Sequence, residues 1–249
     1  MVRSAVILAA FGALVAAPLQ AQDMTVEEIL NNYYEASGGL DNLKSVQSMT
    51  VSGKLTGGQG FEAPFTRYAK RPNMLRMEFT FQGITGVQAF DGETAWMLMP
   101  FMGQTAPEVM APDMATQVKE DADIDGPLVD YQEKGHQIEL VGKDEAEGAE
   151  TYKLKLTLKN GDVTYYHMDA EYFLVIMTEG KRTIQGNELQ FTTVLSDYKE
   201  VGGLMIPHSV EVRGEGPMGQ TILIEVVELN TDIDDELFKM PAGETPPQN

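Results

Sequence analysis

The sequence contains no cysteine, one tryptophan and three histidines. Without cysteine the protein forms no disulfide bond and has no thiol to which a lipid anchor could be attached. After residue 21 there is no run of about 18 apolar residues, so we expect no transmembrane helix in the mature chain. Basic residues are also scarce: 18 stand against 38 acidic ones, and the formal net charge of −20 disfavours nucleic acids and anionic membrane surfaces as partners.

The sequence also lacks the common catalytic motifs. His136, His167 and His208 lie in strand-like segments without the HExxH spacing of zinc enzymes, and there is no GxSxG nucleophile elbow. His208 shares its alternating face with apolar residues, which favours a hydrogen-bonded histidine of the core or of a cavity wall. We therefore predict that the protein is not an enzyme and needs no cofactor.

The first 21 residues have the pattern of a secretory signal. They carry one basic residue, Arg3, then an apolar core over residues 5–17 and small residues before Ala21. We expect cleavage after Ala21 and export of a soluble protein. No Pro/Ser/Gly-rich linker divides the rest, so residues 22–241 are expected to form one domain and residues 242–249 a disordered tail.

An amphipathic helix is predicted at the start of the mature chain. Thr25 and Glu28 have the spacing of a capping box, and Met24 and Ile29 that of a hydrophobic staple. Apolar residues then repeat at helical spacing until a Gly-Gly pair at residues 38–39, which is typical of a helix end.

From about Ser48 the apolar period falls to two. The pattern is clearest in residues 75–81, where every second residue is Leu, Met or Phe. Turn signals such as Asp91-Gly92 and Asn160-Gly161 separate these runs. The sequence therefore predicts an α+β domain with a single curved antiparallel sheet of about eleven strands.

The strand pattern stops between about residues 102 and 134. Pro112 and Pro127 each stand where the first turn of a helix tolerates proline, so we predict two short helices over residues 112–122 and 126–135. One N-terminal helix is too small to cover the apolar face of so wide a sheet. The inserted helices are expected to pack over the same face and to enclose an apolar cavity.

Residues 97–114 contain five methionines and three prolines. Unbranched thioether side chains fill irregular spaces and adapt to changing partners, which suits the pliable wall of a pocket. Two other interpretations remain open at this stage: the methionines are ordinary core residues, or they bind a soft metal such as Cu(I).

An acidic segment raises the question of calcium. Asp121, Asp123, Asp125 and Gly126 match the opening of an EF-hand loop, but the twelfth position is Gln132 instead of glutamate. We assign no metal site and interpret the segment as a solvated acidic turn before the helix at Pro127.

Two motifs resemble the periplasmic outer-membrane lipoprotein carriers, the LolA-like proteins. KRPN at residues 70–73 and DGETAWMLMPF at residues 91–101 are similar to the KRPN and DGxTxWxxxPF patterns of that family. Weaker similarities follow in the order of the family: GPLVDYQEKGH at 126–136, YYHMDAEYFLV at 165–175, VGGLMIPHSV at 201–210 and ELFKMP at 236–241. The resemblance covers nearly the whole mature chain.

The resemblance implies an incomplete β-barrel, closed by helices over an apolar cavity. Such a protein works in the periplasm as a monomer. It accepts the acyl chains of lipoproteins, or a related long-chain lipid, from an inner-membrane transporter and passes them to an outer-membrane acceptor. Arg71, in KRPN, matches the arginine that holds the lid of the empty family members shut. A surface ion pair would be the better interpretation for an arbitrary arginine, but within this motif we predict the lid latch.

We predict that the cavity is lined by apolar residues of two segments, although alternation alone does not say which face points inward. The predicted residues are Leu75, Met77, Phe79, Phe81, Phe90, Trp96, Met97, Met99, Phe101 and Met102. An alternative function is an interaction module that senses envelope stress with the same fold. Such sensors usually have a second domain, and the expectation of a single domain favours a carrier.

Overall fold

The computed structural model describes residues 24–57, 60, 62–184, 187–214 and 219–241. The predicted signal, residues 1–21, and the predicted tail, residues 242–249, lie outside the described residues. Within them, no helix is both long and apolar enough to cross a membrane.

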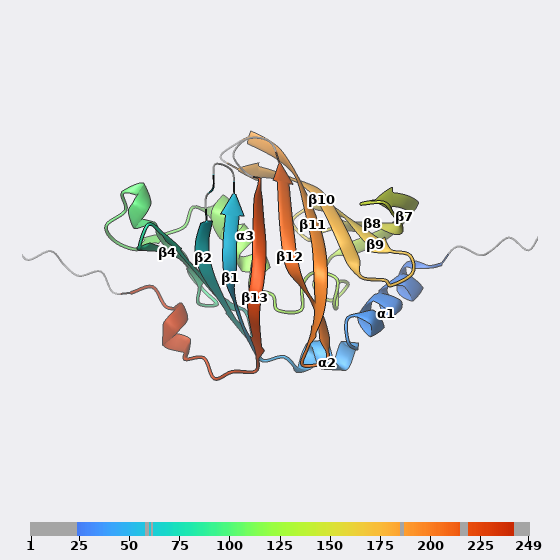
Figure 1. Cartoon of the computed structure of the whole chain (residues 1–249), viewed down its shortest axis with the longest axis horizontal. Helices are drawn as coiled ribbons and strands as arrows, with labels where there is room; N and C mark the ends of the chain where they lie inside the picture. The colour runs from blue at the N-terminus through green and yellow to red at the C-terminus, as the bar shows by residue number, and fades with distance from the viewer. Residues whose placement is uncertain (1–23, 58–59, 61, 185–186, 215–218, 242–249) are drawn as a thin grey trace, which may run out of the picture.

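The strands form one antiparallel sheet in the order β6-β5-β4-β3-β2-β1-β13-β12-β11-β10-β9-β8-β7 (Figure 1). Their bounds are β1 Ser48–Gly57, β2 Glu62–Lys70, β3 Met74–Phe81, β4 Ile84–Phe90, β5 Ala95–Leu98, β6 Glu108–Val109, β7 Gln137–Ala146, β8 Ala149–Thr157, β9 Val163–Asp169, β10 Val175–Ile184, β11 Asn187–Val201, β12 Leu204–Gly214 and β13 Gln220–Leu229. The single curved antiparallel sheet is confirmed, with 13 strands where about eleven were predicted.

Strands that are neighbours in the sheet are consecutive in sequence, with one exception. Strand β1 pairs with β13, the last strand, from Met49–Leu229 to Gly57–Gln220. Strands β6 and β7, which follow one another in sequence, therefore lie at the two opposite edges of the sheet. The residues between them, 110–136, must cross from one edge to the other; we call them the crossing segment.

The helices are short. They are α1 Val26–Ala36, α2 Leu40–Ser45, α3 Pro112–Asp121 and the 3-10 helices η2 Pro100–Met102 and η3 Asp235–Phe238. The predicted capping box is present at α1, where the Thr25 hydroxyl accepts from the Glu28 N–H at 3.2 Å and the Glu28 carboxylate accepts from the Thr25 N–H at 2.8 Å. The helix predicted at Pro112 is confirmed as α3.

The second predicted inserted helix is wrong. Residues 126–135 form a series of turns, with Gly126 and Asp130 at positive φ of 70° and 51°. Packing overrides the helical pattern here, because Leu128 and Val129 are buried and the Tyr34 hydroxyl binds the Leu128 carbonyl at 2.8 Å.

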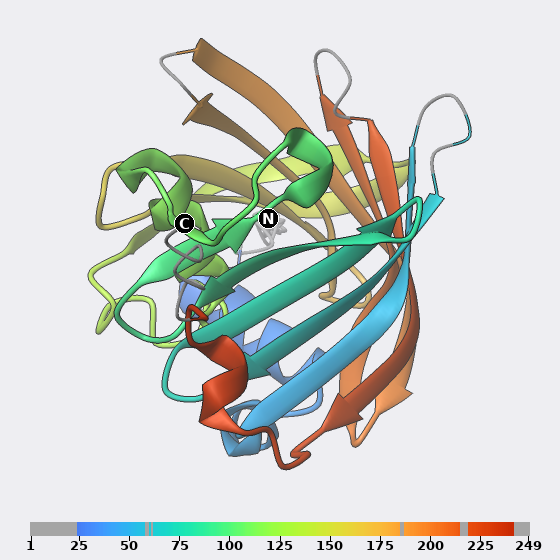
Figure 2. The same ribbon diagram turned by 90° about the vertical axis from the view of Figure 1, so that its left-hand side faces the viewer.

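The concave face of the sheet carries the main core. Figure 2 shows the sheet curving around α3 and the N-terminal helices. Helix α3 packs over β2 to β5 through Val118 and Ala122, against Leu75 and Phe90. Helix α1 packs over β8 to β10 through Ile29 and Leu30. The prediction that the N-terminal helix and an inserted helix cover one apolar face is therefore confirmed.

The convex face has a smaller cover at one end. Helix η3 packs there through Phe238, which is buried with Met74 and Ile233. The Trp96 indole N–H donates to the Phe238 carbonyl at 2.8 Å, and Trp96 is only 1% exposed. The C-terminal segment is thus fixed to the outside of the sheet.

Candidate functional site

The crossing segment borders three cavities on the concave side. The central cavity, of about 1010 Å³, lies between α3 and the β8–β9 strands and is bordered by Leu156, Leu158 and Tyr166. The methionine cavity, of about 520 Å³, lies on the other side of α3. The tyrosine cavity, of about 280 Å³, lies beneath residues 125–128.

The cavities are neighbours separated only by the crossing segment. Thr116, Glu120 and Asp121 of α3 line both the central and the methionine cavity. Asp125 and Pro127 line both the central and the tyrosine cavity. Tyr166 of β9 also lines both the central and the tyrosine cavity, so the three cavities adjoin one another along the crossing segment.

The walls combine apolar side chains with polar ones, such as Gln88 and Gln117 of the methionine cavity. The methionine cavity is lined by Met77, Met110, Met114, Val118 and Ile222, among others. Aromatic and aliphatic residues line the tyrosine cavity: Tyr33, Tyr166, Leu174, Val175, Leu195, Tyr198 and Met205. Ionic groups line much of the central cavity, so the site as a whole is amphipathic.

Arg71 fixes the crossing segment from the sheet side. Its Nη1 and Nη2 donate to the two carboxylate oxygens of Asp125 at 2.7 and 2.6 Å, and its Nε donates to the Val46 carbonyl at 2.6 Å. The Asp125 side chain is 11% exposed. The hydrogen bond to this carboxylate raises the pKa of Arg71 above its usual value, so the guanidinium is always charged.

The other aspartates of the acidic segment also have partners. Lys134 Nζ contacts Asp123 Oδ2 at 2.5 Å and donates to the Gly126 carbonyl at 2.7 Å. The predicted solvated turn is wrong, because cations of the protein hold Asp123 and Asp125. Among the described residues no group of three or more His, Asp or Glu side chains is arranged to hold a metal ion.

Four of the predicted cavity residues lie in or beside the core under α3 and at the methionine cavity. Leu75 and Phe90 are 5% exposed and pack with Met110 and Val118, so they support the helix. Met97 packs against the same cluster, and Met77 lines the methionine cavity.

Three other predicted residues form an aromatic group farther along β3. The Phe101 ring centroid lies 5.5 Å from that of Phe79 and 6.5 Å from that of Phe81. Met99 is 4% exposed and, like Phe101, lies over Gly86, where a Cβ would come within 2.6 Å of Phe101 and 3.0 Å of the Met99 sulfur. Gly86 is what allows η2 to fold back onto the sheet.

Two predicted positions are wrong. Trp96 alternates with Ala95 and Met97 along β5 and therefore points to the convex face, where it packs with Val87 and Ala89. Met102 is 74% exposed at the end of η2 and lines none of the three cavities.

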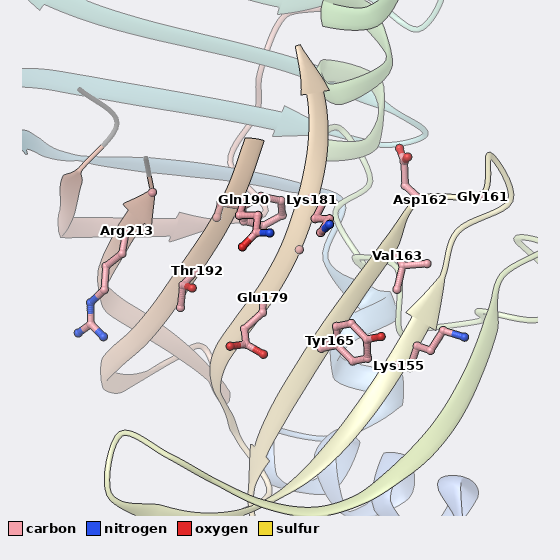
Figure 3. A pocket seen from close by; sticks show the side chains of 13 residues that line it. Lys155, Gly161, Asp162, Val163, Tyr165, Glu179, Lys181, Gln190, Thr192 and Arg213 are labelled. Atoms are coloured by element: carbon pink, nitrogen blue, oxygen red, sulfur yellow. The ribbon is translucent and has the colours of Figure 1, made fainter. Parts of the chain in front are cut away.

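A fourth pocket, of about 740 Å³, lies on the convex face (Figure 3). Charged and polar residues of several strands line it, among them Lys155 of β8, Glu179 of β10 and Arg213 of β12. Its cations are paired within the protein: Arg213 binds Glu147 and Glu211, and Lys155 lies 3.6 Å from Glu139. Apolar residues such as Val163, Tyr165 and Phe191 also line this pocket, but the crossing segment does not border it.

The histidines have structural partners. His167 is 1% exposed, with Nε2 3.1 Å from Glu179 Oε2, and this contact together with Lys153 outweighs burial and lowers the pKa of Glu179. His208 is buried, as predicted, with Nδ1 2.9 Å from the Ile206 carbonyl. His136 lines the central cavity and accepts the Lys159 backbone N–H at Nδ1.

Sequence reasoning did not find several residues of the site. The sequence pattern around Asp125 indicates a calcium loop or a solvated acidic turn, and no pattern indicates a role for Tyr166, Lys119 or Lys159 at the cavity. The alternation of β9 predicts that Tyr166 shares a face with Thr164, and the acid surplus makes any lysine without an acidic partner notable. Neither signal indicates on its own that these residues meet at one cavity.

Comparisons with known proteins bear on the fold. No protein-family model and no curated protein matches the chain. Among solved structures, a LolA superfamily protein from Nitrosomonas europaea is 15% identical, with a TM-score of 0.58 over 87% of this chain and 98% of that one. A DUF1329 family protein from Desulfovibrio piger is 11% identical, with a TM-score of 0.59 over 86% and 97%. An outer membrane lipoprotein-sorting protein domain from Vibrio parahaemolyticus is 11% identical, with a TM-score of 0.54 over 85% and 94%.

These identities are low, so the likeness concerns the fold. The predicted LolA-like fold, an open antiparallel half-barrel with helices on its concave side, is confirmed.

Proposed function

We propose that the protein is a periplasmic carrier that binds the acyl chains of lipoproteins, or a related long-chain lipid, on the concave side of its sheet. The observation that carries the proposal is the set of adjoining cavities separated only by the crossing segment. Ligand pockets in proteins commonly measure about 300–1,000 Å³. The central cavity alone, at about 1010 Å³, is at the upper end of that range.

The crossing segment serves as a movable cover in this proposal. Its polar contacts to the rest of the protein include Arg71 to Asp125, Arg67 to the Asp121 carbonyl at 2.7 Å, and Lys44 of α2 to Asp130. Lifting it joins the methionine, central and tyrosine cavities into one space that accommodates an extended chain.

The free energy gained by burying an acyl chain is large enough to offset the loss of the Arg71 hydrogen bonds. Burying an acyl chain of about sixteen carbons stabilises the bound state by roughly 12 kcal/mol, at about 0.8 kcal/mol per CH₂. Each charge-assisted hydrogen bond of Arg71 contributes about 1.5–3 kcal/mol, so the loss of all three is smaller than this gain or comparable to it. The latch therefore sets a threshold without preventing uptake.

The methionine side chains of the methionine cavity should assist release of the acyl chain as well as its uptake. Met77, Met110 and Met114 present flexible thioether chains to the methionine cavity. Such walls adapt to a chain without the close complementarity that would hold it permanently. Transfer to a better acceptor at the outer membrane then remains feasible, as does transient contact with an inner-membrane donor.

The test is direct analysis of the bound lipid. Protein purified from its native envelope is extracted with organic solvent, and the extract is examined by mass spectrometry for acyl chains. We expect about stoichiometric long-chain lipid. An empty extract, together with no uptake of a fluorescent palmitoyl probe by the delipidated protein, would contradict the proposal and favour an interaction module.

Site-directed variants place the binding site on one face. Met114→Lys and Ile222→Lys introduce charge into the methionine cavity and should abolish probe uptake. A matched control is Val226→Lys, which adds the same charge on an exposed residue of the same strand as Ile222. Equal loss with the control would place binding elsewhere.

A further inference from the structure

We propose that the central cavity binds an anionic head group, a phosphate or carboxylate attached to the acyl chains of the cargo, between Lys119 and Lys159. The inference rests on the carrier function proposed above and specifies the class of its cargo.

The first observation is that these two lysines stand apart from the other cations. Carboxylates outnumber basic groups 38 to 18, and most lysines and arginines of the described chain pair with one, as Lys54 and Lys70 do. In the described ranges, neither Lys119 nor Lys159 has a carboxylate oxygen within 4.0 Å, and both line the central cavity.

The second observation is that they stand on facing walls. Lys119 belongs to α3, and Lys159 belongs to the turn between β8 and β9. The side-chain amide of Asn160 donates to Glu120 Oε1 at 3.0 Å and so joins the residues next to each lysine. The backbone positions of the two lysines are therefore linked across the cavity that both residues line.

Four carboxylates also line the central cavity, and cations of the protein engage two of them. Asp123 is engaged by Lys134 and Asp125 by Arg71, at 2.5 and 2.6 Å. Glu120 accepts the Asn160 side-chain amide at 3.0 Å, and Lys119 Nζ lies 5.5 Å from the centroid of the Phe90 ring.

A neutral donor completes the site. His136 Nδ1 accepts the Lys159 backbone N–H at 3.1 Å, so the proton of the neutral imidazole is on Nε2. Burial, with Lys134 and Lys159 acting in the same direction, lowers the pKa of His136 and keeps it neutral at pH 7. Lysine ammonium groups bind phosphate as point charges, and an imidazole N–H adds a directed hydrogen bond.

The apolar wall beside these groups accounts for an amphipathic ligand. Leu156 lies in β8, and Leu158 and Lys159 follow in the turn to β9. Both leucines line the central cavity. A head group at the lysines would leave its chains directed along this wall, toward Tyr166 and the tyrosine cavity. A free inorganic anion would contact the lysines but not the apolar wall.

The experiment compares lipids that differ only in head-group charge. The full chain is delipidated and exposed to neutral detergent micelles containing either phosphatidylglycerol or phosphatidylcholine with identical acyl chains. Lipid bound per protein is measured after gel filtration. Neutral micelles remove the repulsion between an acidic protein and a charged vesicle surface. We expect about tenfold tighter uptake of phosphatidylglycerol, the effect of one charge-assisted contact.

The variants separate the two proposals. The Lys119→Gln/Lys159→Gln double variant should lose the preference and keep its uptake of phosphatidylcholine. The control Lys54→Gln/Lys199→Gln changes the charge equally at exposed residues outside the cavity and should keep the preference. Inorganic phosphate at millimolar concentration should not compete.

Three outcomes would overturn the inference. Equal uptake of both lipids by the unaltered chain, or an unchanged preference in the double variant, would refute the anionic head group while leaving the carrier function intact. Competition by inorganic phosphate would assign the lysines to a soluble anion. Uptake of neither lipid would refute the carrier function itself, and the inference with it.

Discussion

Arg71 binds both carboxylate oxygens of Asp125, at 2.6 and 2.7 Å, and these two residues join the sheet to the segment that crosses its concave side. The first residue precedes β3 and the second follows α3. The pair is partly buried, with side chains 25% and 11% exposed. Removing one partner should therefore cost more than it does at a surface ion pair, because the other charge is left partly buried without its partner.

Replacing Asp125 with asparagine should loosen the crossing segment. We expect the free energy of unfolding to fall by about 2 kcal/mol, because a partly buried guanidinium loses its charged partner. Amide hydrogen exchange should increase in residues 112–128 more than in the strands. The control is Glu211→Gln, which removes a more exposed partner of Arg213 and should cost about 1 kcal/mol or less. Equal exchange in both variants would argue against a latch.

Two methionines of the same sequence stretch should behave differently. Met114→Gln places an amide at the methionine cavity and should weaken acyl-chain binding about tenfold. Met102→Gln alters a side chain that is 74% exposed and should change neither binding nor, beyond about 0.5 kcal/mol, stability. Titration with a fluorescent palmitoyl probe and urea unfolding measure the two effects. Weakened binding in the Met102 variant would show that the chain extends to η2.

Tryptophan fluorescence should report on the convex face only. Because Trp96 lies under Phe238 on the side opposite the cavities, a brominated acyl chain should leave its emission nearly unchanged. The control is a Trp96→Phe/Phe79→Trp variant, which moves the single indole to the concave side and should be quenched on binding. Strong quenching of Trp96 in the unaltered chain would contradict the assigned face.

Stability should fall through His136 as the pH drops below about 6.5. Burial lowers its pKa in the folded state below the ordinary 6.5, so the unfolded chain takes up a proton first. The stabilisation is fully present above pH 6.5 and is lost as the pH falls through the folded-state pKa. Urea unfolding at several pH values measures this slope, and His136→Gln should flatten it. An identical slope in the variant would exclude His136 as its source.

The sequence predicts those parts of the fold that depend on local patterns. The capping box at Thr25, the proline at the start of α3 and the alternation in β3 each depend on neighbouring residues, and each prediction is confirmed. The predicted helix at Pro127 failed because long-range burial of Leu128 and Val129 overrode the local pattern.

The site was harder to predict than the fold. Trp96 and Met97 are adjacent and equally apolar, yet strand alternation sends them to opposite faces. Only the pairing of β5 with β4 and the position of η3 decide which face each one takes. In the same way, no local pattern indicates that Lys119 and Lys159 border one cavity, because the contact depends on how the crossing segment lies over β8 and β9.

Because β6 and β7 are the two edges of the sheet, both ends of the crossing segment are anchored to the rims of the hollow that it covers. The segment therefore cannot open by a hinge rotation about one end. If the two edges of the sheet move apart, the crossing segment is extended. If they move together, the segment can move away from the sheet. Cargo entry and the curvature of the whole sheet should therefore change together, so a partner that grips either rim would control access without touching the ligand.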